Sequence, residues 1–383
     1  STPWSGIGFL GAASSYLIMF FYSCVAGWVY CYTYKAATGA FADITKEGAE
    51  ALFSATIGAG GAEASFFSST VLAPIFWQVF VLAVVGTIIS LGVAKGIERA
   101  IKVMMPALFV LLIACVIRAL TLPGAADGLY FLFHVDFKQV TPAVVLAAMG
   151  LAFFKLSLGM GTMITYGSYF TDDADLSLSP LKIAVADICI SMLAGLAVFP
   201  TVFSFGVEPG AGPGLLFITI PLVFSQMPFG QVLLFAFFLL TAFAANGAML
   251  SLVEVPTIWM AEEFNISRRR SALINCVIIG AVGILAACSA DGTGYLGAAT
   301  LFGKGFFDLF DYLSSNVTMP IGGLCIAIFT GYVMRRADLF DELSNHGTLR
   351  NDGRAAFIRV LLRYVTPVLV LVIFLNALGV IKL

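Results

Sequence analysis

The charged residue that stands out in this sequence is Lys155, which interrupts the apolar run AAMGLAFFKLSLGMGTMITYGSY. An unpaired charge at the centre of a bilayer costs about 2.5–3.5 kcal/mol on insertion scales, so such residues face a partner or a water-filled cavity. The same run contains Ser157, Gly159 and Gly161 just after the lysine, and glycine weakens a helix and exposes its backbone groups. A charge beside a broken helix is typical of a transport site.

The composition restricts the class of protein. Hydrophobic residues make up 60% of the 383 positions and charged residues only 11%, whereas a soluble domain has roughly 25% charged residues. We therefore expect an all-α polytopic membrane protein with the lipid bilayer as its surroundings. No basic patch is large enough for a nucleic-acid partner. The scattered cysteines form no metal-like pair, and no nucleophile–base pattern is present, so we expect no metal site, no cofactor and no enzyme.

Nine segments are long and apolar enough to cross a membrane, which takes about 20 residues. Placing the first residue in the cytoplasm puts most lysines and arginines on the inner side, as the positive-inside rule requires. The start is then cytoplasmic and the C-terminus lies outside. The predicted crossings are residues 7–34, 74–95, 100–121, 141–170, 181–206, 231–262, 271–291, 304–334 and 356–380.

Two connections are more than short loops. Residues 36–73 form a long outer loop in which ITKEGAEALFSATIG is typical of a short surface helix. Residues 207–230 are apolar but too short and too rich in Gly and Pro to cross the membrane. We interpret 207–230 as an outer lid-like loop; the alternative is a loop that simply packs on the outer surface.

Several motifs together resemble the bacterial neurotransmitter:sodium symporter family, whose members are sodium-coupled amino-acid transporters: FFKLSLGMGTMITYGSY, GIERAIKVMMPALF, AGLAVFPTVFSFG, GPGLLFITIP and FDLFDYLSSN. The resemblance implies a single transmembrane domain over residues 1–383 in the bacterial inner membrane, with an inverted-repeat, broken-helix transporter fold. It also implies that the nine crossings are the family's helices three to eleven. The family's first two helices would then lie outside this sequence, which starts with Ser1 and is expected to begin further upstream.

The resemblance also implies a substrate site. Tyr22, six residues before Trp28, falls where the family has a tyrosine whose hydroxyl binds the substrate carboxylate; taken alone, it would be a packing tyrosine. The matching pocket positions are Ile18 on the same helix, the aromatic gate Phe154, the unwound Ser157, Gly159 and Met160, and the eighth-helix wall Ser251 and Leu252. Asp311 matches an outer-gate carboxylate. This apolar pocket suits an apolar amino acid.

The ion sites depart from the family. Lys155 falls on a threonine ligand of the first sodium ion, and Asp187 falls on an asparagine ligand of the same ion. We predict that these two residues form an acid–base pair in place of that ion; the alternative is that Asp187 faces another polar group or water. In the second sodium site, Gly247 and Ala248 replace two hydroxyl ligands, and Ala244 retains only a carbonyl. Sodium stays possible, with its ligand positions substituted.

These features predict a secondary active transporter, a symporter of apolar amino acids that works by alternating access. The first alternative is a sodium-independent or proton-linked carrier. The second is a non-transporting homologue that acts as a receptor or scaffold. Neither the particular amino acid nor the oligomeric state follows from the sequence.

Overall fold

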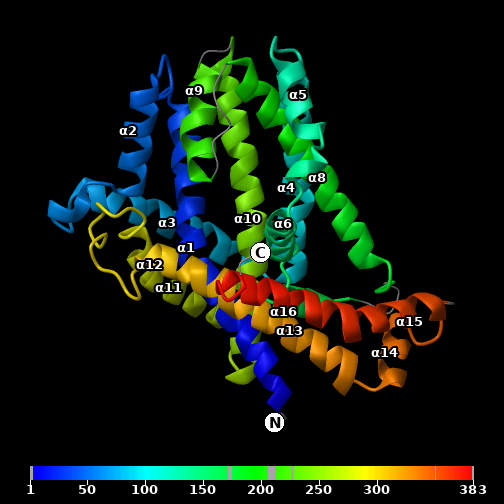
Figure 1. Cartoon of the computed structure of the whole chain (residues 1–383). Helices are drawn as coiled ribbons and strands as arrows, with labels where there is room; N and C mark the ends of the chain where they lie inside the picture. Colours follow the sequence, from blue (N-terminus) through cyan, green and yellow to red (C-terminus); the bar gives the residue numbers. More distant parts are fainter. Residues whose placement is uncertain (1–2, 171–174, 206–211, 226–227, 350, 382–383) are drawn as a thin grey trace.

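The chain is all-helical over the residues that a computed structural model describes, which are 3–170, 175–205, 212–225, 228–349 and 351–381. Eight helices in this part are long and apolar enough to cross a membrane. A further apolar segment is split into the shorter helices α6 and α7. Together these segments match the nine predicted crossings in order, and they pack side by side (Figure 1). The prediction of an all-α polytopic fold is confirmed.

The helices have the following bounds: α1 Gly6–Ala37, α2 Lys46–Ile57, α3 Ser69–Ser90, α4 Arg99–Leu120, α5 Ala125–Phe133, α6 Pro142–Lys155, α7 Thr162–Gly167, α8 Ser179–Ser204, α9 Ile220–Ser225, α10 Gly230–Glu263, α11 Arg268–Ala287, α12 Phe306–Tyr312, α13 Met319–Ile328, α14 Arg336–Leu343, α15 Asp352–Val360 and α16 Thr366–Ala377. Wider helical turns join α12 to α13 and α15 to α16, so each of these pairs forms one continuous crossing, Phe306–Val333 and Asp352–Ala377.

Helix α1 lies at the centre of the bundle, packed against α3, α10 and α11. Met19 and Tyr32 of α1 and Phe238 and Met249 of α10 are completely buried in this core. Both helices are hydrophobic around their whole circumference, as expected for helices that contact protein on several sides. The rigid centre of the bundle is therefore the α1–α10 pair, and the site described below is built against it.

The long connection 36–73 contains the predicted surface helix, which is α2. The Thr45 hydroxyl accepts a hydrogen bond from the backbone N–H of Gly48 at its start, and Gly58 ends it with a φ of 77°. Both are common helix-terminating features: a threonine N-cap and a glycine in the left-handed conformation. This prediction is confirmed.

The described part of segment 207–230 packs closely against the bundle. It contains α9, preceded by a wider helical turn at Leu215–Thr219. The Phe217 ring stacks on Phe53 of α2 at 5.3 Å and meets the Trp28 ring of α1 at 6.0 Å. The segment therefore covers the end of α1 near α2, while residues 206–211 and 226–227 lie outside the described residues. Its action as a lid stays a prediction.

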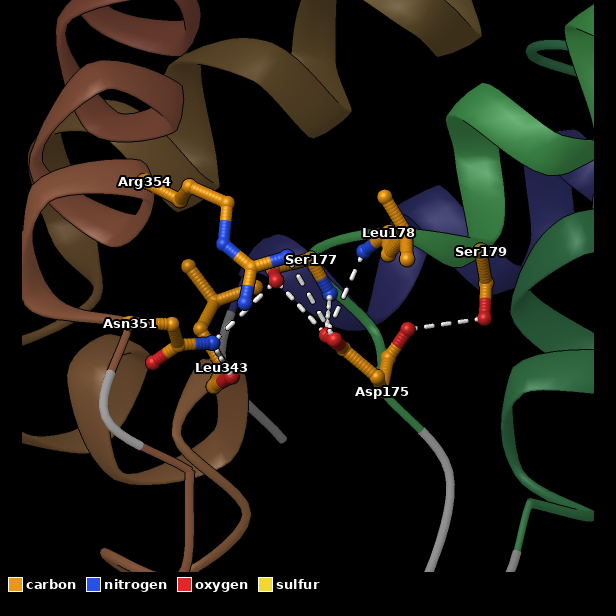
Figure 2. A network of polar contacts seen from close by, with 7 residues as sticks. All are labelled: Asp175, Ser177, Leu178, Ser179, Leu343, Asn351 and Arg354. Atoms are coloured by element: carbon orange, nitrogen blue, oxygen red, sulfur yellow. Dashed lines mark hydrogen bonds and ion pairs between the residues drawn. The ribbon is translucent and has the colours of Figure 1, made fainter.

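A polar network ties the segment before α8 to the C-terminal helices (Figure 2). The Asp175 carboxylate accepts hydrogen bonds from the Ser177 hydroxyl at 2.6 Å and from two backbone N–H groups, and it pairs with Arg354 at 3.5 Å. The Asn351 amide donates to the Ser177 hydroxyl at 3.1 Å. These contacts join the chain that leads out of α7 to the connection between α14 and α15.

Candidate substrate and ion site

The helix that carries Lys155 is interrupted where the sequence predicts. Helix α6 ends at Lys155 and α7 begins at Thr162. Between them, Ser157, Gly159 and Gly161 have φ values of 56°, 77° and 80°. Three left-handed residues within five positions cannot continue a right-handed helix. The predicted break at residues 157–161 is confirmed.

Glycine is required in this break because neighbouring backbone comes very close. A Cβ atom on Gly159 would lie 2.1 Å from the carbonyl oxygen of Met319. A Cβ on Gly161 would lie 2.8 Å from Val255 of α10 and 3.1 Å from Gly11 of α1. The break is therefore held between the α1–α10 pair on one side and the start of α13 on the other.

Helix α1 presents one continuous stripe towards the break. Gly11 touches Gly161, and the Ser15 hydroxyl donates a hydrogen bond of 2.7 Å to the carbonyl of Met160. Ile18 and Tyr22 follow at intervals of three and four residues, which places them on the same helix face. Ile18 is 1% exposed and Tyr22 is half-buried. The Tyr22 side chain thus belongs to the face that meets the break.

The other predicted pocket residues come from the break and from α10. The Tyr166 hydroxyl of α7 lies 3.1 Å from the Ser251 hydroxyl of α10, which links the second half of the broken helix to that wall. Leu252 and Met160 are buried, and Phe154 is partly buried against the same core. The structure brings Ser15 of α1 and Val255 of α10 into contact with the break and joins α7 to Ser251 of α10. The roles of Ile18, Tyr22, Phe154 and Leu252 in a substrate pocket stay predictions.

Lys155 and Asp187 form the ion pair that the sequence predicts. The Lys155 Nζ lies 3.1 Å from the Asp187 Oδ2, although the residues belong to different helices, α6 and α8. Lys155 also donates to the Ser191 hydroxyl, which itself donates to the carbonyl of Asp187 at 2.6 Å. A hydroxyl and a carboxylate thus surround one ammonium group at the end of α6. The predicted pairing is confirmed.

The second ion position shows only an open helix face. Ala244, Gly247 and Ala248 lie on one side of the unbroken helix α10, and no neighbouring atom would come within 4 Å of a Cβ on Gly247. Asn246 points away from this face, because its amide donates to the Tyr30 hydroxyl of α1. Ala244, Gly247 and Ala248 have no side-chain oxygen, so a sodium ion at this face of α10 stays without hydroxyl ligands from these three positions.

Asp311 lies at a distance from these residues, on α12. Its side chain is exposed and accepts a hydrogen bond from the Ser315 hydroxyl at 3.1 Å. The preceding Phe310 packs on Phe20 of α1 with ring centres 5.2 Å apart, so Asp311 is held next to the central helix. Its role as a gate stays a prediction.

The sequence analysis did not single out Glu254, a completely buried carboxylate in α10. Arg268 of α11 pairs with it at 2.5 Å, and the Tyr169 hydroxyl also donates to it. Glu254 could have been found from the sequence in the same way as Lys155, because it is a charged residue within an apolar run, LSLVEVPTIW. This cluster ties the segment after α7 to the α10–α11 corner.

A cavity of ≈ 420 Å³ lies on the α13–α16 side of the break. Ser157 and Gly159 line it together with apolar residues of those two helices, such as Val370. Its lining includes Ser157 and Gly159 of the predicted pocket but no residue of α1 or α10.

Comparisons with known proteins agree on one family. A family model described as the sodium:neurotransmitter symporter family matches residues 68–382. The chain is 36% identical over its full length to an uncharacterized sodium-dependent transporter of Bacillus subtilis, YhdH, covering 81% of that protein. It is 32% identical to an uncharacterized sodium-dependent transporter of Haemophilus influenzae, over 98% of this chain and 79% of the relative.

A solved structure has the same fold. The crystal structure of MhsT in complex with L-phenylalanine matches with a TM-score of 0.85 and 37% sequence identity. The match covers 98% of this chain and 82% of MhsT. At this level of similarity the overall helix arrangement of the chain is that of MhsT.

Proposed function

The chain belongs to the sodium:neurotransmitter symporter family and is a membrane-embedded secondary transporter, and we propose that its substrate is an apolar amino acid and that the Lys155 ammonium takes the place of the first sodium ion. The observation that carries the proposal is the 3.1 Å contact between Lys155 and Asp187 beside the helix break.

The wall around the break is apolar. Ile18, Met160 and Leu252 are buried hydrophobic residues, and Phe154 packs against the same core. A pocket with such walls and few polar groups favours an aliphatic or aromatic side chain. MhsT, which shares the fold, is described in complex with L-phenylalanine, and this supports the same substrate class here.

Two kinds of polar group would hold the amino-acid backbone. The Tyr22 hydroxyl is a donor suited to the substrate carboxylate. The unwound stretch from Ser157 to Gly159 would offer carbonyls to the substrate ammonium, since the Met160 carbonyl already accepts a hydrogen bond from Ser15 and the Gly161 carbonyl accepts one from the Thr165 N–H. In this proposal the Tyr22 hydroxyl and these carbonyls bind opposite ends of one amino-acid backbone.

A sodium ion does not fit beside Lys155. Two unit charges 4 Å apart repel by about 4 kcal/mol at an effective dielectric constant of 20. Asp187, which would have to ligate the ion, already accepts the ammonium, and Ser191 accepts from it too. The lysine therefore supplies the positive charge that the substrate carboxylate and Asp187 would otherwise share with the ion.

The second sodium position also lacks ligands that suit a sodium ion. Hard cations bind oxygen ligands, and Ala244, Gly247 and Ala248 contribute no side-chain oxygen. The relatives are described as sodium-dependent, so the substitutions at both positions set this chain apart. We therefore propose transport that does not require sodium.

Uptake into proteoliposomes tests the function. The purified full chain is reconstituted, and accumulation or exchange of labelled L-phenylalanine and L-leucine is measured, with L-glutamate and L-lysine as charged controls. We expect exchange of the apolar amino acids alone. Saturable binding of L-phenylalanine to the purified chain without any exchange would contradict transport and favour a receptor. Preference for a charged amino acid would contradict the proposed substrate class.

A further inference from the structure

A pocket at the far end of the C-terminal helices contains three arginines. Arg336 at the start of α14, Arg359 at the end of α15 and Arg363 in the following turn line a cavity of ≈ 260 Å³. Phe340 and Tyr364 provide part of its wall. The pocket lies where α14 and α15 meet (Figure 1), and its lining includes no residue of the α1 stripe or of the helix break.

These arginines carry charge that the rest of the described chain does not neutralise. Within the described residues, none of the three is within 4.0 Å of a carboxylate oxygen. Nearby carboxylates are engaged elsewhere: Asp175 pairs with Arg354, and Asp341 pairs with His346. The Arg363 Nε atom is buried, and no described residue accepts a hydrogen bond from it.

Aromatic rings hold the guanidinium groups in position. The Arg363 guanidinium lies 5.0 Å from the Tyr332 ring centre and 5.6 Å from that of Tyr364, and the Arg336 guanidinium lies 5.0 Å from the Phe340 ring centre. Stacking on a ring leaves the edge of a guanidinium free to donate hydrogen bonds. The pocket thus presents preformed donors, and its missing component is an anion with several acceptor oxygens.

The surroundings of the pocket identify the source of that anion. The crossing Asp352–Ala377 is apolar and almost entirely uncovered by the rest of the chain. Val360, Tyr364, Val368 and Leu371 form one exposed stripe at intervals of four, four and three residues, starting at the pocket. An anion bound by the arginines is therefore continuous with a surface that suits acyl chains.

We propose that this pocket binds the phosphate of an anionic phospholipid, with its acyl chains along the Val360–Leu371 stripe of the crossing Asp352–Ala377. Basic pockets between helices at the inner membrane surface bind such headgroups, and tyrosines are enriched at the same depth. The positive-inside assignment places these arginines at the inner surface, where anionic lipids give the cytoplasmic leaflet a negative potential. The lipid would bridge α14 and α15, which meet the polar network of Asp175 (Figure 2).

The test is the melting temperature of the full chain in detergent, followed by tryptophan fluorescence. The chain is titrated with short-chain phosphatidylglycerol, with phosphatidylcholine of the same chain length, or with inorganic phosphate. We expect stabilisation by phosphatidylglycerol alone. Equal stabilisation by phosphatidylcholine would overturn the proposal, and so would an equal effect of inorganic phosphate, which would indicate a site for a free anion.

Variants assign the effect to the pocket. Arg336→Gln should weaken the affinity for phosphatidylglycerol about fivefold, which is the effect of one arginine near an anionic surface. Arg359→Gln with Arg363→Gln should weaken it further. Arg335→Gln is the matched control, because Arg335 is the exposed neighbour in sequence and does not line the pocket. If the paired variant does not fold, the comparison of Arg336→Gln with Arg335→Gln is sufficient to test the site, because Arg336 is an exposed residue of α14 and its replacement should leave the fold intact. Equal losses in Arg335→Gln and Arg336→Gln would refute the site.

Discussion

The Lys155 ammonium lies 3.1 Å from the Asp187 carboxylate, across the gap between α6 and α8, directly before the point where the broken helix unwinds. Each residue would be unfavourable alone in a membrane. Their pairing offsets the cost of burying each charge in the membrane. In our proposal this ion pair takes the place of the first sodium ion beside the substrate.

A double-mutant cycle on Lys155→Thr and Asp187→Asn tests the pairing. We expect each single variant to lower the free energy of unfolding, because it leaves the other charge unpaired, and the double variant to be more stable than the sum of the two losses predicts. A coupling of about 0.5–3 kcal/mol is the range for residues in contact. The measurement is thermal unfolding in detergent, and strictly additive effects would mean that the contact contributes nothing.

Tyr22→Phe should weaken the binding of L-phenylalanine by roughly 1–3 kcal/mol, because a buried carboxylate loses a hydrogen-bond donor. Equilibrium binding of labelled substrate to the purified chain measures the change. Tyr34→Phe is the control, since Tyr34 lies on the same helix but is 59% exposed near its end. Unchanged affinity in Tyr22→Phe would remove this residue from the substrate site.

Glu254 should be one of the most sensitive positions for stability. Glu254→Ala leaves Arg268 without its partner in a buried position, and the loss expected for breaking a buried pair is about 3–5 kcal/mol. The paired change Glu254→Leu with Arg268→Leu should recover much of this loss, because it removes both charges. Arg269→Gln, an exposed neighbour, should have little effect. A paired variant as unstable as the single one would contradict this account.

The contact between the segment before α8 and helix α15 should become less stable at acid pH, because Asp175 is part of it. Hydrogen bonds from Ser177, together with Arg354, lower the pKa of the Asp175 carboxyl below its ordinary value of 3.8. A lowered pKa in the folded state means that the contribution is fully present above pH 3.8 and is lost as the pH falls through the folded-state value.

Melting temperatures of the parent chain and Asp175→Asn, measured from neutral pH downwards, check this expectation. The difference between them should be constant above pH 3.8 and shrink below it. Glu50→Gln, which changes an exposed carboxylate of α2, should show no such convergence. A difference that grows on acidification would have the wrong sign.

Local sequence signals predicted much of the fold. The crossings follow from long apolar runs, and the break follows from Ser157, Gly159 and Gly161 within one such run. Boundaries were less accurate: the crossing predicted at 74–95 is α3 at Ser69–Ser90, because Gly92 adopts a φ of 92° and ends it early, while Pro74 is tolerated in its first turns.

Features that depend on which helices are neighbours could not be predicted from local signals. Asn246 stands next to the substituted Gly247 in the sequence, yet its amide donates to the Tyr30 hydroxyl, because α1 packs tightly against this part of α10. The three-arginine pocket depends on the meeting of α14 with α15, whose first residues, Arg336 and Asp352, are sixteen positions apart in the sequence. The contact between Lys155 and Asp187 could be predicted from the sequence only through the resemblance, which places both residues around one ion of the family.

The most direct test of the central claim is the sodium dependence of L-phenylalanine binding to the purified chain, measured at equilibrium in sodium chloride and in N-methyl-D-glucamine chloride of equal ionic strength. If the Lys155 ammonium replaces the first sodium ion, the dissociation constant should be the same in both salts, while Lys155→Thr with Asp187→Asn should bind more tightly in sodium. Binding by the unmodified chain that requires sodium would contradict the claim.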